Sequence, residues 1–411
     1  MFEAKCIQSA KQFGILYMKN KFPPDFLFGS ATSAHQIEGH LNNDWSRWEK
    51  TPGKISDGST SAVSADSWNR WRDDIKILKN SGQNAYRFSI EWSRIEPKAG
   101  FFDKKSIAHY RDMIDELLKN DITPMVTLWH FTSPLWLDDI GGVLNRKFPT
   151  YFSRFAGRMA KEFGDKIELW SVLNEPTVYL NAGFIQGNWY PGKKRQYFSA
   201  VKAFFRFVAA HKQAYTSMKS ANSRIKVGIA HNMSAYFPVK DRWRDRFMTK
   251  FTKWFTNEYF LNQIKGELDF IGINHYLTHH IQCKKPIIFD QIGKEQDYWW
   301  PVRPYGIREV IKDAGRYHLP IYITENGLGD HGEADKLRGR YIEEIFEQLR
   351  LTLKDGADLR GYFFWSLIDN FEWASGYSMK FGLHTIDRKP KKSAEVYKKN
   401  IENCRFKQSL L

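Results

Sequence analysis

Cysteine is scarce in this chain, and long apolar runs are absent from it. The 411 residues include three cysteines, Cys6, Cys283 and Cys404, and no two of them have the C-x-x-C spacing of a zinc or redox site. This argues against a disulfide framework and favours a reducing, cytoplasmic location. The longest nearly apolar run near the N-terminus, Phe13 to Met18, is too short for a secretory signal or a membrane span. No membrane partner is therefore expected.

Cofactor and nucleic-acid signals are also missing. The chain has no H-E-x-x-H, no acidic calcium loop and no glycine-rich phosphate loop, so we expect neither a metal nor a cofactor. The formal net charge is +16, but the basic residues are dispersed, and the longest clusters are short ones such as Lys193 to Arg195 and Lys389 to Lys392. No nucleic-acid-binding motif accompanies them, so we interpret the charge as a solvated surface and expect no nucleic-acid partner.

Aromatic residues, by contrast, are abundant. The chain contains 31 Phe, 19 Tyr and 15 Trp, and 42% of its residues are hydrophobic, which is ample for one large core. So many Trp side chains suit interfaces or the flat faces of sugar rings. No repeat, low-complexity tract or linker marks a second domain. Met18 directly precedes Lys19, so residues 1–17 are interpreted as an extension or an upstream start, and residues 18–411 as one folded domain.

Short β-rich runs alternate with longer amphipathic stretches along the chain, which is typical of βα units and a parallel sheet. Eight strands are predicted, at Leu27 to Ala31, Ala85 to Ile90, Pro124 to Trp129, Leu169 to Asn174, Lys226 to Ala230, Phe270 to Asn274, Ile321 to Glu325 and Gly361 to Ser366. The clearest helices are Asp66 to Asn80 and Asp335 to Lys354, where apolar residues recur every third or fourth position. These elements predict an α/β fold, a single-domain (β/α)₈ TIM barrel with its active site at the C-terminal mouth of the strands.

Two carboxylates end predicted strands that would face this mouth. Glu175 ends the fourth strand and Glu325 the seventh. One such Glu alone would more often form a surface salt bridge. A pair is different, because retaining glycoside hydrolysis needs two carboxyl groups about 5 to 5.5 Å apart, one protonated and one ionised. Opposite strands of a barrel can supply that spacing.

The chain also resembles the family 1 glycoside hydrolases, the β-glucosidase and β-galactosidase group, from Phe22 to Lys399. Seven ordered motifs carry the resemblance: FPPDFLFGSATSAHQIEG, YRFSIEWSRI, LWHF, VLNEP, DFIGINHY, YITENG and GYFFWSLIDNFEWASGYSMKFGL. The resemblance implies that Glu175 is the acid/base and Glu325 the nucleophile, and that Arg87 and Tyr276 hydrogen-bond the nucleophile. Desolvation and the charge of Glu325 should raise the pKa of Glu175 so that it can donate a proton.

The resemblance further implies a sugar-binding set, whose members are Gln36, His130, Asn174, Asn274, Trp365, Glu372 and Trp373. Amides and a carboxylate suit vicinal hydroxyls, and a Trp face suits the apolar side of a pyranose. Taken singly, His130 would more often be a core histidine and either Trp a core residue. Asn274 could instead orient the two carboxylates.

The chain departs from the family at two places, and a third place separates it from one group of members. The region between Tyr236 and Asp269 is short, which should open the leaving-group side of the cleft. Phe131 stands where the family usually has Trp, so a polar N–H is lost at the edge of the sugar pocket. The eighth loop has Glu372, Met379 and Phe381, unlike members that act on 6-phosphorylated sugars. A carboxylate at the 6-hydroxyl would repel phosphate, so non-phosphorylated glycosides are expected.

The sequence therefore predicts a retaining exo-β-glycosidase that acts on small-molecule or oligosaccharide β-glycosides, with terminal glucosyl and also galactosyl or fucosyl residues as substrates. The alternative is a transglycosylase that uses the same two carboxylates and transfers the sugar to an acceptor other than water. A non-catalytic sugar-binding protein would usually have lost one carboxylate, and both are present. Whether the chain forms a homo-oligomer is left open.

Overall fold

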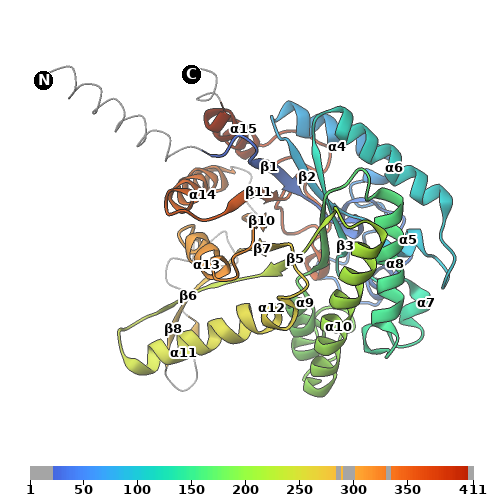
Figure 1. Cartoon of the computed structure of the whole chain (residues 1–411), viewed down its shortest axis with the longest axis horizontal. Helices are drawn as coiled ribbons and strands as arrows, with labels where there is room; N and C mark the ends of the chain where they lie inside the picture. Colours follow the sequence, from blue (N-terminus) through green and yellow to red (C-terminus); the bar gives the residue numbers. More distant parts are fainter. Residues whose placement is uncertain (1–21, 284–287, 290–300, 330–334, 406–411) are drawn as a thin grey trace, which may run out of the picture.

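Eight parallel strands close into a barrel at the centre of the protein (Figure 1). The computed structural model describes residues 22–283, 288–289, 301–329 and 335–405, so the predicted extension at 1–17 lies outside the described residues. Around the barrel the strand order is β1-β11-β10-β7-β5-β4-β3-β2. The strands are β1 Leu27–Ala31, β2 Ala85–Ser89, β3 Thr123–Trp129, β4 Leu169–Asn174, β5 Lys226–Asn232, β7 Phe270–Asn274, β10 Ile321–Asn326 and β11 Leu359–Trp365. The predicted fold class and all eight predicted strands are confirmed.

The strands form where the sequence is almost continuously apolar, because both faces of a barrel strand are covered. Every residue of β2, β4 and β7 is buried. The first strand, β1, pairs with β2 on one side and with the last strand, β11, on the other, and this closes the barrel. The carboxyl ends of all eight strands therefore surround one mouth.

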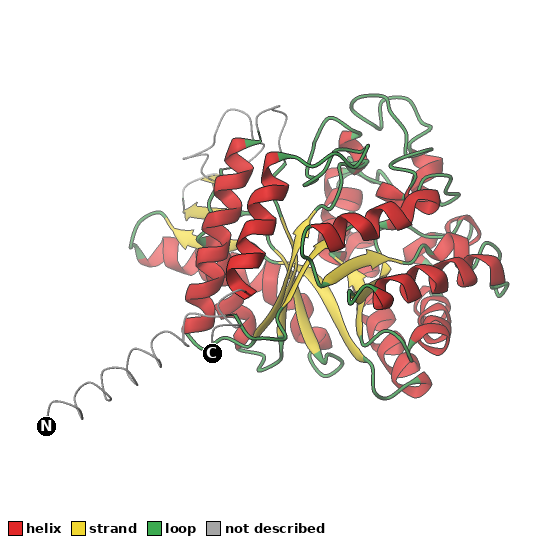
Figure 2. Cartoon of the chain, turned by 90° about the horizontal axis from the view of Figure 1, so that it is seen from above, coloured by secondary structure: helices red, strands yellow, loops and turns green. Residues whose placement is uncertain are grey.

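Helices surround the strands, as Figure 2 shows from a second direction. The longer ones are α4 Ser67–Asn80, α6 Lys104–Lys119, α8 Phe148–Phe163, α10 Tyr197–Ala221, α11 Trp243–Lys253, α12 Tyr259–Ile264, α13 Gly306–Gly315, α14 Lys336–Lys354 and α15 Lys392–Arg405. Short helical segments are α2 Ala34–Ile37, α3 Asp44–Trp48, α5 Trp92–Ile95, α7 Leu135–Asp138, η1 Gly142–Leu144, α9 Pro176–Leu180, η2 Asn181–Gln186, η3 Trp254–Glu258 and η4 Trp373–Ser375. Both predicted helices are confirmed, and each begins one residue later than predicted.

The sequence did not predict a second, small sheet. It consists of β6 Ala235–Pro238, β8 Thr278–Gln282 and β9 Ile288–Phe289, with β6 parallel to β8 and β8 antiparallel to β9. Its first two strands follow the carboxyl ends of β5 and β7, so the sheet extends the wall of the barrel beyond the mouth. The short region between Tyr236 and Asp269 thus contains most of β6 together with α11, η3 and α12. The wider outer cleft expected there stays a prediction.

Within the described ranges, no helix combines the length and the apolar character needed to cross a membrane. Two of the three cysteines lie in these ranges. Cys283 is exposed and Cys404 is buried.

A buried arginine on α14 joins this helix to two loops at the barrel mouth. The side chain of Arg338 is 1% exposed, and its Nη1 donates to Asp335 Oδ1 at 2.6 Å. The same guanidinium donates to the backbone oxygens of Leu328, Lys380 and Gly382 at 3.0, 2.6 and 3.1 Å. Leu328 follows β10, and Lys380 and Gly382 lie in the long loop after β11, so one side chain holds both loops in place.

We predict that Arg338→Met lowers the free energy of unfolding by about 3 to 5 kcal/mol, because it leaves the buried Asp335 carboxylate without its cation. Arg350→Met is a matched control on the same helix, since Arg350 pairs with the half-exposed Glu347 at 3.0 Å. Arg350→Met should lower the free energy of unfolding by less than about 1 kcal/mol. Urea denaturation followed by Trp fluorescence measures both. Equal losses in the two variants would contradict the role given to Arg338.

Candidate active site

Two buried carboxylates face each other across the mouth of the barrel. Glu175 directly follows β4, and Glu325 lies near the end of β10; their exposed fractions are 7% and 4%. Strands β5 and β7 separate β4 from β10 in the barrel. Asn274, the last residue of β7, lies between the two carboxylates and donates to Glu175 Oε1 at 2.9 Å. The predicted pair is therefore brought to one site.

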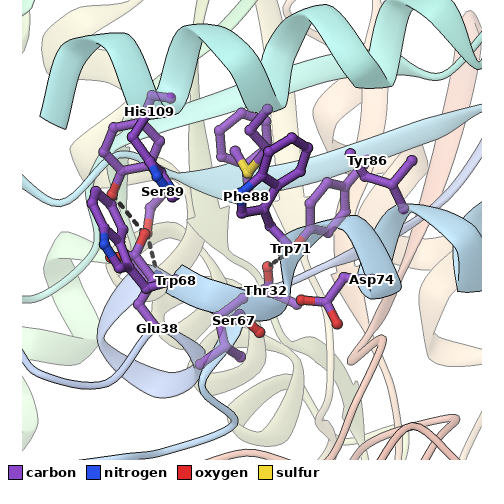
Figure 3. A pocket seen from close by; sticks show the side chains of 15 residues that line it. Thr32, Glu38, Ser67, Trp68, Trp71, Asp74, Tyr86, Phe88, Ser89 and His109 are labelled. Carbon is purple, nitrogen blue, oxygen red and sulfur yellow. Dashed lines mark hydrogen bonds between the residues drawn. The ribbon is translucent and has the colours of Figure 1, made fainter. Parts of the chain in front are cut away.

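Arg87 lies inside the barrel beneath Glu325. Its neighbours in β2, Tyr86 and Phe88, point outwards toward α4 and α6 (Figure 3), so the alternation of a strand turns Arg87 to the barrel axis. The guanidinium is fully buried and donates to Glu325 Oε1 at 2.5 Å. The guanidinium also donates to the Thr127 hydroxyl and to the Thr324 backbone oxygen. Arg87 is thus held by β3 and by β10, the strand that contains Glu325.

Glu325 is surrounded by groups that favour its ionised form. Besides Arg87, the Tyr276 hydroxyl donates to Glu325 Oε2 at 2.9 Å, so each carboxylate oxygen accepts a hydrogen bond. Burial raises the pKa of Glu325 above its usual value, and the charge of Arg87 and the hydrogen bonds from Arg87 and Tyr276 offset part of this rise. With a cation in direct contact, Glu325 is the carboxyl group of the pair that ionises first.

Glu175 has neutral hydrogen-bond donors instead. Its Oε1 accepts from Asn274 and, at 3.3 Å, from Asn232 Nδ2. Burial, and then the negative charge of Glu325, raise the pKa of Glu175 to about 8. Glu175 therefore holds a proton at neutral pH while Glu325 is the ionised partner. A proton donor and an ionised carboxylate then lie at one mouth.

The backbone at Glu175 is unusual for a residue with a side chain. Its φ is 42° and its ψ is 53°, in the left-handed region. Such a conformation costs on the order of 1 kcal/mol and persists only where the surrounding structure enforces it. Pro176, with its fixed φ, begins α9 immediately afterwards. The turn from strand to helix thus sets the direction of the Glu175 side chain.

Asn174 links Arg87 to His130. Arg87 Nη2 and Asn274 Nδ2 both donate to Asn174 Oδ1, at 2.7 and 3.0 Å, which identifies this atom as the amide oxygen. Asn174 Nδ2 therefore donates to His130 Nε2 at 3.1 Å, and the proton of the neutral ring lies on Nδ1. Burial lowers the pKa of His130 well below its usual value, so the ring is neutral. His130 Nδ1 is buried and has no hydrogen-bond partner among the described residues.

Gln36, in the segment after β1, hydrogen-bonds to Glu372, in the loop after β11. Gln36 Nε2 donates to Glu372 Oε2 at 3.0 Å and to Asn370 Oδ1 at 2.9 Å, while its own oxygen accepts from the Ser33 hydroxyl at 2.7 Å. Burial, and then the charge of Glu325, raise the pKa of Glu372 to about 8. In the described part of the chain, Glu372 forms no ion pair. Gln36 thus positions this carboxyl group rather than offering a free amide.

Aromatic rings complete the site. The His130 ring lies nearly parallel to Trp365 and to Trp373, with centroids 5.8 and 6.1 Å apart. Phe131 meets Trp373 edge to face at 5.2 Å and is itself buried. The hydrogen bond that a Trp at position 131 would offer is replaced by this apolar contact. All the predicted site residues therefore lie in one connected cluster at the mouth.

The sequence missed four residues that touch this cluster: Asn232, Asn370, Thr127 and Thr324. Asn232 contacts Glu175, Asn370 contacts Gln36, and the two threonines fix Arg87 and Asn274. Each lies in or just after a predicted strand or its following loop. A polar residue at the carboxyl end of a barrel strand is the signal that could have identified Asn232.

The cavity shown in Figure 3 is separate from this site. It lies between β2 and the helices α4 and α6, and its volume of about 20 Å³ has room for one water. Thr32 and Tyr86 share a hydrogen bond of 2.6 Å on its wall. Its position behind the strand, away from Glu175 and Glu325, makes it a packing gap.

Comparison with known proteins agrees with this geometry. The sequence model of glycosyl hydrolase family 1 matches residues 18–264 and 253–406. The chain is similar to the 1,4-beta-D-glucan glucohydrolase of Thermotoga neapolitana, with 33% identity over 89% of this chain and 98% of the relative. It is also similar to beta-glucosidase A of Acetivibrio thermocellus, with 32% identity over 94% of this chain and all of the relative.

Solved structures match in three dimensions as well. The family 1 β-glucosidase from Thermotoga maritima superposes with a TM-score of 0.88 at 31% identity, over 94% of this chain and 99% of that one. The same enzyme in complex with glucoimidazole gives a TM-score of 0.87 over the same shares.

We predict that Glu175→Gln stabilises the protein at pH 8 but much less at pH 5. A folded-state pKa of about 8 lies above the unfolded value of about 4.3, so wild-type stability falls as the pH rises between these values. The neutral Gln cannot ionise and avoids this loss. The difference in Tm between variant and wild type should grow by roughly 3 °C or more from pH 5 to pH 8.

Differential scanning calorimetry measures this difference. Glu343→Gln, which neutralises an exposed carboxyl group on α14, controls for the change in net charge. A Tm difference that stays constant with pH would show that Glu175 is already ionised at pH 5.

Proposed function

Because the chain belongs to glycosyl hydrolase family 1 and is an O-glycosyl hydrolase, we propose that it hydrolyses terminal β-D-glucosyl residues with retention of configuration. The observation that carries this proposal is the contrast between the two carboxyl groups. Glu175 has only amide donors and a pKa of about 8, whereas Glu325 is in contact with Arg87 and Tyr276. One group can give a proton while the other attacks as an anion.

In the first step, a Glu325 oxygen bonds to the anomeric carbon and the bond from this carbon to the leaving oxygen breaks. Glu175 transfers its proton to the leaving oxygen, so the aglycone departs as a neutral alcohol. The product is a glycosyl ester on Glu325. Arg87 and Tyr276 fix the orientation of the attacking carboxylate, which lowers the entropic part of the barrier.

In the second step, water replaces the sugar on Glu325. Once the ester has formed, the negative charge of Glu325 is gone, and one cause of the raised Glu175 pKa disappears with it. Glu175, now ionised, takes a proton from water as the water oxygen bonds to the anomeric carbon and the ester bond breaks. Two displacements at the same carbon restore the β configuration.

The remaining polar groups suit a single terminal sugar. Asn174 Nδ2 has one hydrogen left after the bond to His130. It can serve a hydroxyl on one edge of the ring, while Glu372 serves hydroxyls on another and the Trp365 and Trp373 rings cover apolar C–H surface. The same contacts allow galactosyl and fucosyl residues, which we include in the proposed substrate range.

Phosphorylated sugars do not suit this pocket. Glu372 lies where the resemblance places the 6-hydroxyl, and its neighbours Met379 and Phe381 are buried apolar residues. A phosphate would bring its negative charge beside the ionised Glu325, whose partner Arg87 is already occupied. Glu175 and Glu372, with pKa values of about 8, offer it no positive charge. A buried charge without a cation is costly, so the substrate is proposed to be non-phosphorylated.

We predict that Glu325→Ala abolishes hydrolysis of every substrate, while Glu175→Ala retains the first step for good leaving groups. An activated aryloxide departs without a proton, whereas a sugar leaving group needs one. With p-nitrophenyl β-D-glucoside and cellobiose as the pair, Glu175→Ala should lose about 10²-fold or more activity on cellobiose relative to the aryl glucoside. Nuclear magnetic resonance should detect β-glucose as the first sugar released by wild type.

Two results would contradict these roles. If Glu175→Ala lost equal activity on both substrates, Glu175 would not be the general acid. If α-glucose were the first product, water would attack the anomeric carbon directly, in a single displacement. Gln186→Ala is a control, because this side chain lies in η2, outside the cluster described above.

A second prediction concerns the sugar. Initial rates on p-nitrophenyl β-D-glucoside, β-D-galactoside and β-D-fucoside should exceed the rate on β-D-glucoside 6-phosphate by roughly 10-fold or more, because Arg87, the cation in the described part of the site, is already paired with Glu325. Glu325→Ala is the background control. Faster turnover of the phosphorylated substrate would overturn the proposed substrate class.

A further inference from the structure

Four aromatic side chains form an exposed row along α11 and into η3. They are Trp243, Phe247, Phe251 and Phe255, each four residues after the last, with exposed fractions of 66%, 61%, 49% and 59%. A spacing of four keeps them on one side of a helix. We call these four residues the α11 stripe. Figure 1 places α11 at the outer edge of the molecule, away from the barrel core.

The other side of α11 is polar and buried, which is the reverse of an ordinary barrel helix. Asp245 and Thr249 are buried, and Asp245 Oδ1 accepts from the backbone N–H of Cys283 at 2.7 Å. The Thr249 hydroxyl donates to the backbone oxygen of Asp245 at 2.7 Å. In α4, by contrast, Trp71 and Ile75 face the core. The hydrogen bond between Asp245 and the backbone of Cys283, just after β8, therefore fixes the polar side of α11 against the protein. The α11 stripe on the other side faces solvent.

Exposed cations lie beside the stripe. They are Arg242, Arg244, Arg246 and Lys250, all on or next to α11. The exposed acid nearby, Asp241, is paired with Arg246 at 2.7 Å. The Arg244 guanidinium lies 5.3 Å from the centre of the Trp243 ring. Rows of aromatic and basic side chains thus share one surface.

The surface continues onto the first turns of α10. Phe198, Val201 and Phe205 are exposed there, at 88%, 55% and 51%. Phe204 connects the two regions, because its ring centre lies 5.3 Å from that of Phe205 and 5.3 Å from that of Tyr259. The Tyr259 ring in turn stacks on Phe255 at 6.4 Å. The apolar area is therefore larger than one helix face.

We propose that this surface docks the protein on an anionic lipid bilayer. A helix with Trp and Phe on its outer side and Arg and Lys beside them lies in the plane of a membrane interface, with the rings among the acyl chains and the cations at the headgroups. Exposed apolar areas of this size mark interaction surfaces. The net charge of +16 adds attraction toward anionic headgroups.

Other occupants fit the surface less well. A second copy docked through the same face would bring its own arginines and lysines against these cations, and like charges repel. Single-stranded nucleic acid binds grooves lined with stacking rings, whereas the α11 stripe lies along the outside of a helix at the edge of the molecule. The expectation of no membrane partner concerned runs long enough to span a bilayer, and an interfacial helix needs no such run.

Co-sedimentation of the full chain with vesicles tests the proposal. Wild type should pellet with vesicles of phosphatidylglycerol and phosphatidylcholine, and at least about tenfold less with phosphatidylcholine alone. Replacing Trp243, Phe247 and Phe251 together by Ser should weaken binding to the anionic vesicles at least tenfold. The matched control replaces Phe101, Leu118 and Ile140 by Ser; these are exposed apolar residues on or near α6 and α7.

Activity on a soluble aryl glucoside should be the same in wild type and both triple variants, so loss of docking is distinguishable from loss of the proposed function. Three results would overturn the proposal: no wild-type binding to anionic vesicles, equal binding by the stripe variant, or equal binding to neutral vesicles. Binding of an oligonucleotide or formation of a dimer that depends on the α11 stripe, without vesicle binding, would assign the surface to that partner instead.

Discussion

The buried ion pair between Arg87 and Glu325 is the interaction on which the site depends. A carboxylate at this depth would take up a proton if it were alone, because burial penalises its charge. Arg87 prevents this and is itself fixed by Thr127 and the Thr324 backbone. Its remaining donor goes to Asn174, which fixes the amide orientation and hence the tautomer of His130. One side chain thus sets the protonation of several others.

The same pair explains the asymmetry between the two buried carboxyl groups at the mouth, Glu175 and Glu325. Glu325 has the only described cation in contact with either of them, and Glu175 receives the repulsion of the resulting negative charge. The two groups lie at one mouth of the barrel and are almost equally buried, yet they are driven to opposite protonation states. The difference in protonation arises because Arg87 contacts Glu325 and does not contact Glu175. It does not arise from a difference in burial between the two residues.

Much of the fold and of the candidate site could be predicted from the sequence. Apolar runs indicate the barrel strands, and the candidate site residues lie at or near the carboxyl ends of these strands. The strand limits agreed within two residues, and every predicted site residue lies in the cluster. Asn232 was missed for a specific reason: the fifth strand was predicted to end at Ala230, whereas β5 continues to Asn232 and brings it to Glu175. Hydrogen bonds such as that from Gln36 to Asn370 join distant loops, and no local pattern specifies them.

The orientation of α11 could not be predicted for a related reason. Its aromatic spacing is that of a core-facing helix, and burial of that row would be the ordinary expectation. Which side turns inwards is decided by the contact of Asp245 with the chain after β8, a segment that is not adjacent in sequence. Most Phe and many Trp side chains of this protein lie in the buried core, and the α11 stripe adds a second location at the outer surface.

The contact of Gln36 with Asn370 and Glu372 joins residues 334 and 336 positions apart, next to the first and the last strand of the barrel. During synthesis on the ribosome, Gln36 emerges long before its partners are made. This contact is therefore absent until the final strand and its following loop have left the exit tunnel. A nascent chain stalled before this point would contain Glu175 and Glu325 and still lack the hydrogen bonds that join Gln36 to Asn370 and Glu372.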